Sequence, residues 1–146
     1  MADISTVASL FCSVLGLQRA RLTLQALTSA VCNRWHSDKV TARACRSKLI
    51  AVRGLVTFCG AGTEFLDDRD ADRRELQRFL RRDTGGFGVR RNGAVHRAAA
   101  GDLLLLKGHS YAGNAGRGAV HRSPEASPCA PRLLIVLDDI LEFQED

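Results

Sequence analysis

The segment from Ser47 to Asp68 most constrains the fold, because it joins two predicted strands through a glycine turn. In its first half, apolar residues recur at period two, as on one face of a half-buried strand, at Ile50, Val52, Val56 and Phe58. Gly54 lies on this same face, and a glycine inside a strand weakens it unless the chain bends or bulges there. Strands of a small coiled barrel need such a bend. The segment therefore predicts the opening hairpin of a barrel.

Two further segments read as strands of the same kind. Residues Gly101 to Gly108 form a tight turn followed by four leucines and a lysine, and the run again ends in glycine. Residues Arg132 to Asp139 form a short apolar run, rich in branched residues, between Pro131 and two aspartates. Both segments favour a protein that is mainly β.

Together these segments resemble the oligonucleotide/oligosaccharide-binding (OB) fold, in particular its genome-maintenance branch. That branch includes the middle subunit of replication protein A, the telomere-capping Stn and Ten proteins, and RecQ-mediated genome instability protein two. Its first strand reads roughly apolar-x-Val-x-Gly-x-Val, its second ends near Asp-Asp, and its fourth opens with Gly-x-x-apolar-x-apolar-x-Gly. The match covers residues 47–143, but the Asp67–Asp70 turn lacks the usual Thr-Gly and an insertion precedes the fourth strand. The resemblance implies a single five-stranded barrel over residues 47–146, after a helical segment over residues 1–46.

The N-terminal segment, from residue 4 to about residue 34, has apolar residues at helical spacing. We expect an amphipathic helix that Asp3 or Ser5 caps and that Gly16 kinks or divides. Residues 70–83 fit either a helix, which we favour slightly, or the third barrel strand. In the helical alternative the third strand is residues 86–91, and Asn92-Gly93 forms a turn.

The amino-acid composition limits the classes of protein to which this chain can belong. With 146 residues, 45% hydrophobic and 25% charged, the chain fits one ordinary globular domain with a modest appendage. No apolar run approaches the roughly 20 residues of a membrane helix, so we expect an intracellular protein. Five scattered cysteines argue against a disulfide framework, and the four histidines show no metal-ligand spacing with them. We therefore expect neither metal nor cofactor.

The charge distribution favours a nucleic-acid partner. The net charge is +5 and the isoelectric point about 9.3, with a basic middle and an acidic C-terminal end. Single-strand binding by OB barrels combines a basic groove with exposed aromatic rings. Residues 112–131 are rich in glycine and proline and predict a long loop beside this groove. On the OB model the candidate contacts are Arg53, Phe65, Phe87, Arg90, Arg91, Lys107, His109, Tyr111, Arg117 and Arg122.

Catalytic motifs are weaker. The glycine-rich stretches at residues 60–62 and 85–88 lack the lysine of a phosphate-binding loop, and they read as turns. Asp67-Asp68 and Asp138-Asp139 could bind magnesium, but adjacent carboxylates on a strand project to opposite faces. No nucleophile elbow is present. We expect a protein without enzymatic activity.

The resemblance implies an accessory subunit of a nuclear genome-maintenance complex that docks another OB subunit and shares, or has lost, contact with single-stranded DNA. Two alternatives stay open, a free-standing single-stranded DNA- or RNA-binding protein and an assembly adaptor without any nucleic-acid role. The N-terminal helix and the acidic C-terminal end are the docking candidates. The predicted partner-binding residues are Val7, Phe11, Val14, Leu24, Leu27, Ile140 and Phe143.

Overall fold

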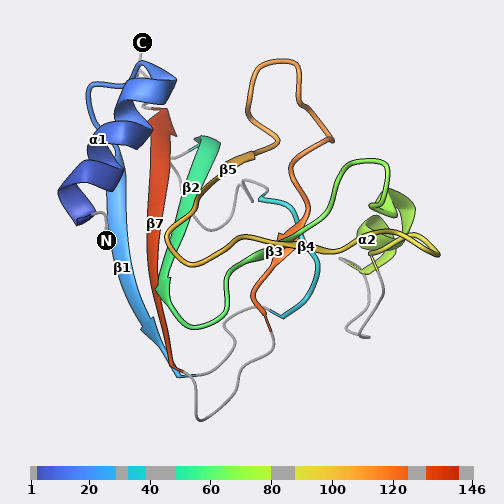
Figure 1. Ribbon diagram of the computed structural model, residues 1–146. Coiled ribbons are helices and arrows are strands. Elements are labelled where there is room, and N and C mark those ends of the chain that lie inside the picture. Colours follow the sequence, from blue (N-terminus) through green and yellow to red (C-terminus); the bar gives the residue numbers. More distant parts are fainter. Residues whose placement is uncertain (1–2, 29–32, 39–48, 80–87, 125–130, 142–146) are drawn as a thin grey trace.

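The computed structural model describes residues 3–28, 33–38, 49–79, 88–124 and 131–141. Within these residues the chain is mainly β, with an N-terminal helix, a short second helix and two antiparallel sheets (Figure 1). The expected mainly β class is therefore confirmed. No described helix is long and apolar enough to cross a membrane.

The first helix, α1, spans Ile4–Leu15 and has well-formed caps. At its start the Thr6 N–H donates to Asp3 Oδ1 at 2.7 Å, which satisfies one of the unpaired amides of the first turn. At its end Gly16 adopts the left-handed conformation, with φ 66°, that favours glycine after a helix. The predicted cap at Asp3 is confirmed, whereas Gly16 ends the helix instead of kinking or dividing it.

The helix predicted to continue to residue 34 is wrong beyond Gly16. Residues Arg21–Leu27 instead form strand β1, which pairs along its whole length with strand β7, Arg132–Leu141. In this stretch Leu22 and Leu24 alternate with polar residues, so the pattern also fits a strand. Pairing with β7 supplies backbone hydrogen bonds from a distant segment, and that tertiary contact decides between the two patterns.

The large sheet has the strand order β1-β7-β2-β5, with all pairs antiparallel. Strand β2 spans Leu49–Cys59 and β5 spans Leu103–Lys107. The three strands expected from the apolar runs are thus confirmed as β2, β5 and β7. Because β1 comes from the N-terminal segment, the described parts of residues 1–46 and 47–146 share one sheet.

The small sheet has the order β4-β3-β6, and its strands are β3 (Glu64–Phe65), β4 (His96–Arg97) and β6 (His121–Arg122). His36 extends this sheet beyond β6 through an antiparallel bridge to His121. The His36 N–H donates to the His121 carbonyl at 3.0 Å, and the His121 N–H donates back at 2.8 Å. A short extended segment around His36 therefore completes the small sheet.

In chain order, the extended segments fall in the large, small, large, small, small, large, small and large sheet. This alternation is that of a double-sheet jelly roll. The described strands therefore form two sheets and do not close into the single five-stranded barrel that we expected. Both architectures use long strands interrupted by glycine, so the motif around Gly54 does not distinguish them.

The helical alternative for residues 70–83 is confirmed over α2, Arg73–Phe79. The third strand expected with it is reduced, among the described residues, to one bridge between Val89 and Ala71. Asn92 has φ 68°, as the predicted turn requires. The loop predicted over residues 112–131 contains strand β6, so that prediction is wrong for the middle of the segment.

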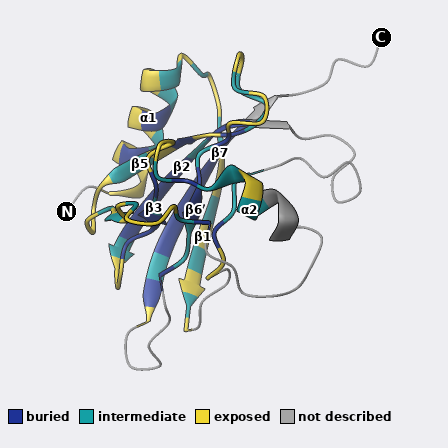
Figure 2. Cartoon of the chain, turned by 90° about the vertical axis from the view of Figure 1, so that its right-hand side faces the viewer, coloured by how far each residue is buried: buried dark blue, intermediate teal, exposed yellow. Residues whose placement is uncertain are grey.

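Two apolar layers flank the large sheet. On its outer face Val7 and Phe11 of α1 pack against β2 and β7, at Val52, Val56, Ile135 and Leu137. Figure 2 shows the buried residues concentrated on these central strands. The face of β2 that we expected inside a barrel therefore lies under α1. Because side chains alternate along a strand, the intervening residues of β2 and β7 face inward.

Candidate metal centre and its pocket

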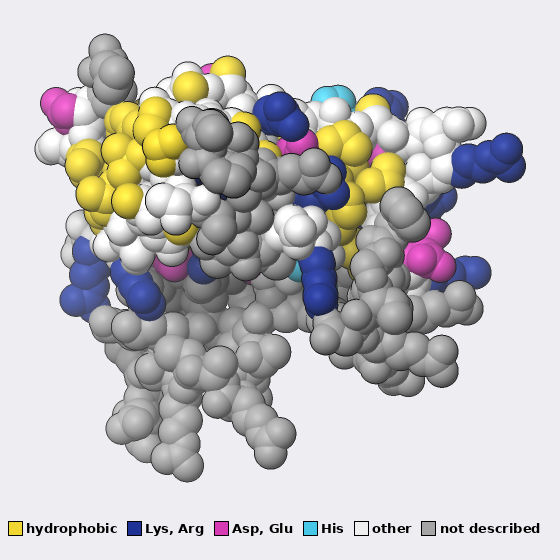
Figure 3. Space-filling view, turned by 90° about the horizontal axis from the view of Figure 1, so that it is seen from below, with side chains coloured by type: hydrophobic (Ala, Val, Ile, Leu, Met, Phe, Trp, Pro, Cys, Tyr) yellow, Lys and Arg dark blue, Asp and Glu magenta, His cyan; other side chains and the backbone are white. Residues whose placement is uncertain are grey.

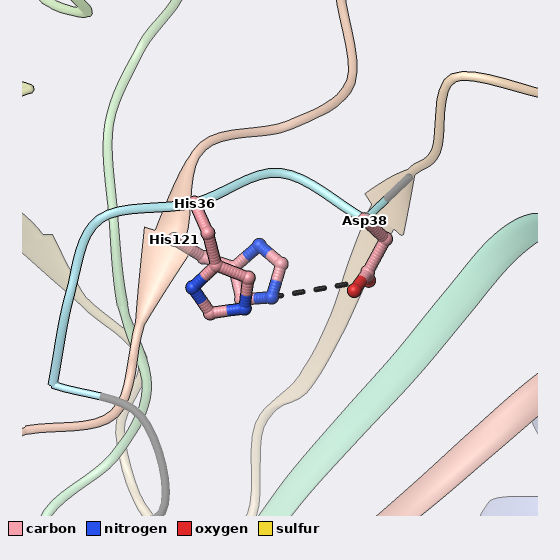
Figure 4. A group of neighbouring side chains, drawn as sticks. All are labelled: His36, Asp38 and His121. Carbon is pink, nitrogen blue, oxygen red and sulfur yellow. Dashed lines mark ion pairs between the residues drawn. The ribbon is translucent and has the colours of Figure 1, made fainter. Parts of the chain in front are cut away.

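Two histidines and an aspartate converge between the short segment at residues 33–38 and strand β6. Nitrogen or oxygen atoms of His36, Asp38 and His121 all lie within 4.8 Å of one another. The Nε2 atom of His121 is 3.9 Å from Asp38 Oδ2, and the two imidazole centroids are 4.4 Å apart. Figure 4 shows both rings and the carboxylate gathered in one place. We call this group the His2Asp cluster.

The local sequence explains how the first two members meet. In an extended segment, residues two apart project to the same side, so His36 and Asp38 share a side. The bridge between His36 and His121 then places the second imidazole beside the first. The segment is also tied down from the other direction, because Ser37 Oγ lies 2.8 Å from His109 Nε2. The position of the cluster therefore follows from backbone pairing.

Hydrogen bonds fix the tautomer of each imidazole. His36 Nδ1 lies 2.9 Å from the Arg34 carbonyl oxygen, and His121 Nδ1 lies 3.1 Å from the Ala119 carbonyl oxygen. A carbonyl oxygen can only accept, so each Nδ1 carries a proton, and in the neutral ring the lone pair is then on Nε2. Histidines that bind metals are usually held in this way, with the non-ligating N–H donated to a carbonyl or carboxylate.

His121 is also uncharged at neutral pH. Its side chain is buried, and this burial, together with the neighbouring His36, lowers the pKa of the His121 imidazole to about 4. Neutral imidazole is the form that binds metal ions, because the protonated ring has no lone pair to donate. The ligand form of His121 is thus already present at pH 7.

The spacing of the cluster is close to that of a metal site. Two ligands about 2.1 Å from one metal ion lie roughly 3.0 to 3.4 Å apart, for octahedral and tetrahedral angles respectively. The 3.9 Å between His121 Nε2 and Asp38 Oδ2 exceeds this by less than an ångström. Small side-chain rotations would bring the atoms to ligand distances.

Arg53 holds the other oxygen of Asp38. Its Nη1 donates to Asp38 Oδ1 at 3.0 Å, while its Nε and Nη2 donate to the two oxygens of Asp138 at 2.7 and 3.2 Å. Asp138 lies opposite Arg53 on the neighbouring strand β7 and is buried. The carboxylate of Asp38 is therefore held by the large sheet, although Asp38 itself lies outside it.

A pocket of about 250 Å³ opens beside the cluster and is lined from both sheets. His36 and His121 lie on one side, and residues of β1, β2 and β7 lie on the other. Four arginines line it, at Arg21, Arg53, Arg122 and Arg132. Its walls therefore favour an anionic ligand.

Arg132 is the most unusual of these residues. It is only 7% exposed, and its Nη2 donates to two neutral hydroxyl groups, those of Thr57 at 3.1 Å and Thr63 at 2.6 Å. Its Nε is buried and has no hydrogen-bond partner, and no carboxylate in the described part of the chain forms an ion pair with it. Burial lowers the pKa of this guanidinium. A buried charge without a counter-ion is costly, and it marks a place for an anion.

A second group, Asp67, Asp70 and His96, also brings possible ligand atoms within 4.8 Å. Arg69 competes there, with nitrogens 3.4 Å from Asp67 and 3.8 Å from Asp70. The Asp67 and His96 side chains are about half exposed. This group is therefore the weaker candidate for a metal site.

Two predicted nucleic-acid contacts, Arg53 and Arg122, lie in the pocket rather than on an open groove. Arg122 Nε donates to Glu64 Oε2 at 2.6 Å, and its guanidinium carbon lies 4.5 Å from the centroid of the Trp35 ring. Both arginines thus already have charged partners within the chain.

Four others lie at the end of β5 or in the loop after it. Lys107 Nζ sits 4.5 Å from the centroid of the Tyr111 ring, and Arg117 Nη2 lies 3.1 Å from Asp68 Oδ2. His109 joins this group, since its Nδ1 accepts from the Gly116 N–H at 3.1 Å. The loop is thus held together by the groups that were expected to contact nucleic acid.

The remaining predicted contacts are dispersed. The ring of Phe65 stacks on His96 with centroids 5.4 Å apart, Arg90 donates to a backbone carbonyl, and Arg91 is exposed. Phe87 lies outside the described residues. On the face in Figure 3, the Lys and Arg side chains are scattered rather than joined into one stripe. Binding of nucleic acid stays a prediction.

The predicted partner-binding residues separate into buried and exposed ones. Val7 and Phe11 are buried against the large sheet, so their apolar surface is already covered within the chain. Val14 is 58% exposed, Leu24 is 52% exposed, and Leu27 is half-buried against the inner core. Two further predicted residues lie outside the described side chains, Ile140 and Phe143.

Sequence reasoning missed the His2Asp cluster. Its signal is the His36-Ser37-Asp38 triplet, which looks like a polar helix end unless the segment is known to be extended. A further signal is Arg132, the first residue of an otherwise apolar strand that follows His121. Each of these two sequence signals is weak alone, and only the strand topology shows that the residues lie close together.

No curated protein matches this chain. A family model described as "Protein of unknown function (DUF1826)" matches residues 1–138, a range that includes the His2Asp cluster, Arg53, Arg132 and Asp138. Because this match covers nearly the whole sequence, the chain belongs to the DUF1826 family.

Proposed function

We propose that this protein is a mononuclear non-haem iron(II) oxygenase in which His36, Asp38 and His121 bind the metal. The observation that supports this most is the His2Asp cluster itself, in which one nitrogen of each imidazole and one carboxylate oxygen lie within 4.8 Å of one another. Two histidines and one carboxylate that leave coordination positions open are typical of non-haem iron(II) oxygenases. The proposal replaces our expectation of a protein without metal or catalysis.

The architecture supports the proposal by analogy. Double-sheet jelly rolls include the cupins, and such folds can enclose a site between their sheets. Here the cluster and the pocket lie between the large and small sheets. A fold does not imply a function, so the donor set carries the argument and the fold adds to it.

The pocket supplies the second part of the proposal, an organic acid co-substrate. Arg132 presents a planar fork of donors that matches a carboxylate, and no described carboxylate neutralises it. A small 2-oxo dicarboxylic acid has one carboxylate for Arg132 and a 2-oxo acid end for the open metal positions. Thr63 lines the same pocket and bonds to Arg132, so it can help to hold that carboxylate.

This assignment gives a balanced reaction. The 2-oxo acid loses its carboxyl group as CO₂ and is oxidised to the shorter carboxylic acid, which takes one oxygen atom of O₂. The other oxygen atom enters a C–H bond of the principal substrate as a hydroxyl group. The 2-oxo acid supplies two electrons and the substrate supplies two, which together reduce O₂ fully.

Metal binding tests the first part of the proposal. Metal-free protein is titrated with Fe(II) without oxygen and, in parallel, with Co(II) and Zn(II). We expect His36→Ala and His121→Ala to weaken binding by more than the 10- to 100-fold that is typical for removing an outer-shell partner. His96→Ala is the matched control, because it removes a histidine from the exposed group at Asp67 and Asp70 and should leave binding unchanged.

Oxygen consumption tests the second part. Iron-loaded protein with 2-oxoglutarate as the probe should consume O₂ and release CO₂ slowly even without the principal substrate, and Arg132→Met should abolish this. Metal binding that survives His121→Ala but is lost in His96→Ala would contradict the metal assignment. Tight zinc binding without any iron- and 2-oxo-acid-dependent O₂ uptake would instead favour a zinc site of the same donor set.

A further inference from the structure

We infer that Arg53 is a positioning residue that fixes Asp38 so that only its Oδ2 atom faces the metal, with Asp138 as the anchor of Arg53. This inference rests on the proposed metal centre. It assigns a task to two charged residues that do not touch the metal themselves. The chain Asp138–Arg53–Asp38 connects the large sheet to the metal ligand.

The three hydrogen bonds use different nitrogens of one planar group. Nε and Nη2 form a two-pronged contact with the carboxylate of Asp138, at 2.7 and 3.2 Å. Because the guanidinium is rigid and planar, this contact fixes the direction of Nη1, which donates to Asp38 Oδ1 at 3.0 Å. One rigid group therefore determines how the carboxylate of Asp38 is turned.

The anchor is built into the centre of the large sheet. Arg53 and Asp138 are cross-strand partners on β2 and β7, and Asp138 is 6% exposed. Asp38 lies in the short segment at residues 33–38, outside the regular strands. The rigid sheet thus orients a ligand from a less regular segment.

The consequence concerns the number of open metal positions. With Oδ1 engaged by Arg53, the oxygen on the His121 side is Oδ2, at 3.9 Å from Nε2, and Asp38 binds the metal through one atom. Without the fork, the carboxylate can turn and chelate the metal through both oxygens. Chelation would occupy a position that the organic acid or O₂ needs. Arg53 therefore preserves the open positions.

The choice of variants must separate orientation from charge. Removing Arg53 altogether would also remove a positive charge near the metal. The loss of that charge would by itself strengthen the binding of a cation. Arg53→Lys keeps the charge but loses the planar fork. Asp138→Asn leaves Arg53 in place and weakens its anchor. Asp139→Asn is the matched control, since Asp139 is the next residue of β7, is also buried, and projects to the opposite face.

The experiment is a Co(II) titration of the metal-free full chain, followed by its visible absorption spectrum, which reports coordination geometry. We expect Arg53→Lys and Asp138→Asn to bind Co(II) at least about tenfold more weakly than the parent, as is typical when an outer-shell partner is removed. Their Co(II) spectra should also differ from that of the parent, which a loss of stability alone would not cause. Asp139→Asn should match the parent in both measurements.

Circular dichroism confirms that each variant is folded at the temperature of the titration. If Arg53→Lys does not fold, Asp138→Asn alone decides the question. A parent that binds no Co(II) would end the proposed metal centre, and this inference with it. A parent that binds Co(II), with Asp138→Asn indistinguishable from Asp139→Asn in affinity and spectrum, would overturn the positioning role while leaving the metal centre intact.

Discussion

Gly54 allows a direct test of how α1 and β2 pack. A Cβ atom added at this position would lie 2.7 and 2.9 Å from two ring carbons of Phe11, and 3.2 Å from Leu103 Cδ1. These distances are well inside van der Waals contact, and Phe11 is completely buried, so its ring has little room to move. The glycine is therefore required by the close approach of α1.

The magnitude for Gly54→Ala follows from two opposing effects. Overpacking a dense core costs about 1 to 3 kcal/mol. Restricting the unfolded chain by replacing glycine returns roughly 0.4 to 1 kcal/mol, where the backbone conformation suits alanine. We expect a net loss of about 0 to 2.6 kcal/mol in the free energy of unfolding, with the upper half favoured by the close contacts to Phe11. Gly54→Val, with a larger and branched side chain, should lose more.

A double-mutant cycle separates this contact from a general weakening of the strand. Phe11→Leu removes the ring atoms that the new methyl group would strike, so Gly54→Ala should cost less in that background. We expect a coupling energy of about 0.5 to 3 kcal/mol, measured by urea unfolding and linear extrapolation. Val14→Ala, at an exposed position of the same helix, is the control and should be additive with Gly54→Ala. Additivity between Gly54→Ala and Phe11→Leu would refute the packing of α1 on this face.

Substitutions at the pocket, at the start of α1 and at the predicted nucleic-acid contacts have separate expected outcomes. Arg132→Met should change the stability of the metal-free protein by less than the roughly 3 to 5 kcal/mol lost when a buried ion pair is broken, because no carboxylate of the described residues pairs with Arg132. Chemical unfolding measures this change. Asp3→Ala should lower the free energy of unfolding through loss of the N-cap, and Asp3→Asn should restore most of it; chemical unfolding measures both. Any binding of single-stranded DNA should weaken steeply as the salt concentration rises. The double substitution Arg90→Ala and Arg91→Ala should reduce the slope of log affinity against log salt by roughly 0.7 for each phosphate that the protein no longer neutralises. Titration of a labelled oligonucleotide at several salt concentrations tests this, and absence of binding at low salt would count against any nucleic-acid role.

Strands β2, β5 and β7 of the large sheet could be predicted because their patterns are local. Residues 49–59 and 132–141 contain long apolar runs that few other structures accommodate, and the caps of α1 are fixed by Asp3 and Gly16. Strand β1 could not be predicted in the same way. Its leucines fit helical spacing from Leu17 onward as well as they fit alternation, and only β7 decides the matter.

The overall architecture depends on contacts that the sequence does not display. The strands of the small sheet contain two residues each, too few for any periodicity to be visible. His36 and His121 meet through a single backbone bridge between distant segments. The His2Asp cluster was missed for this reason, since each of its residues lies in a segment that looks like a polar loop.

The inner face of the large sheet shows why these residues point to function. Along β7 the inward positions are Arg132, Leu134, Val136 and Asp138, so the centre of the face is apolar and its two ends are charged. Stability alone would favour apolar residues throughout, because buried charges rarely repay the loss of their hydration. One end anchors Arg53, and through it Asp38, while the other presents a guanidinium that no carboxylate of the described residues neutralises. Departures from local stability rules tend to occur at functional sites, and here both departures border the same pocket as the two histidines. A metal bound by Asp38 would give the pair of Asp138 and Arg53 a task, and an anion would neutralise Arg132.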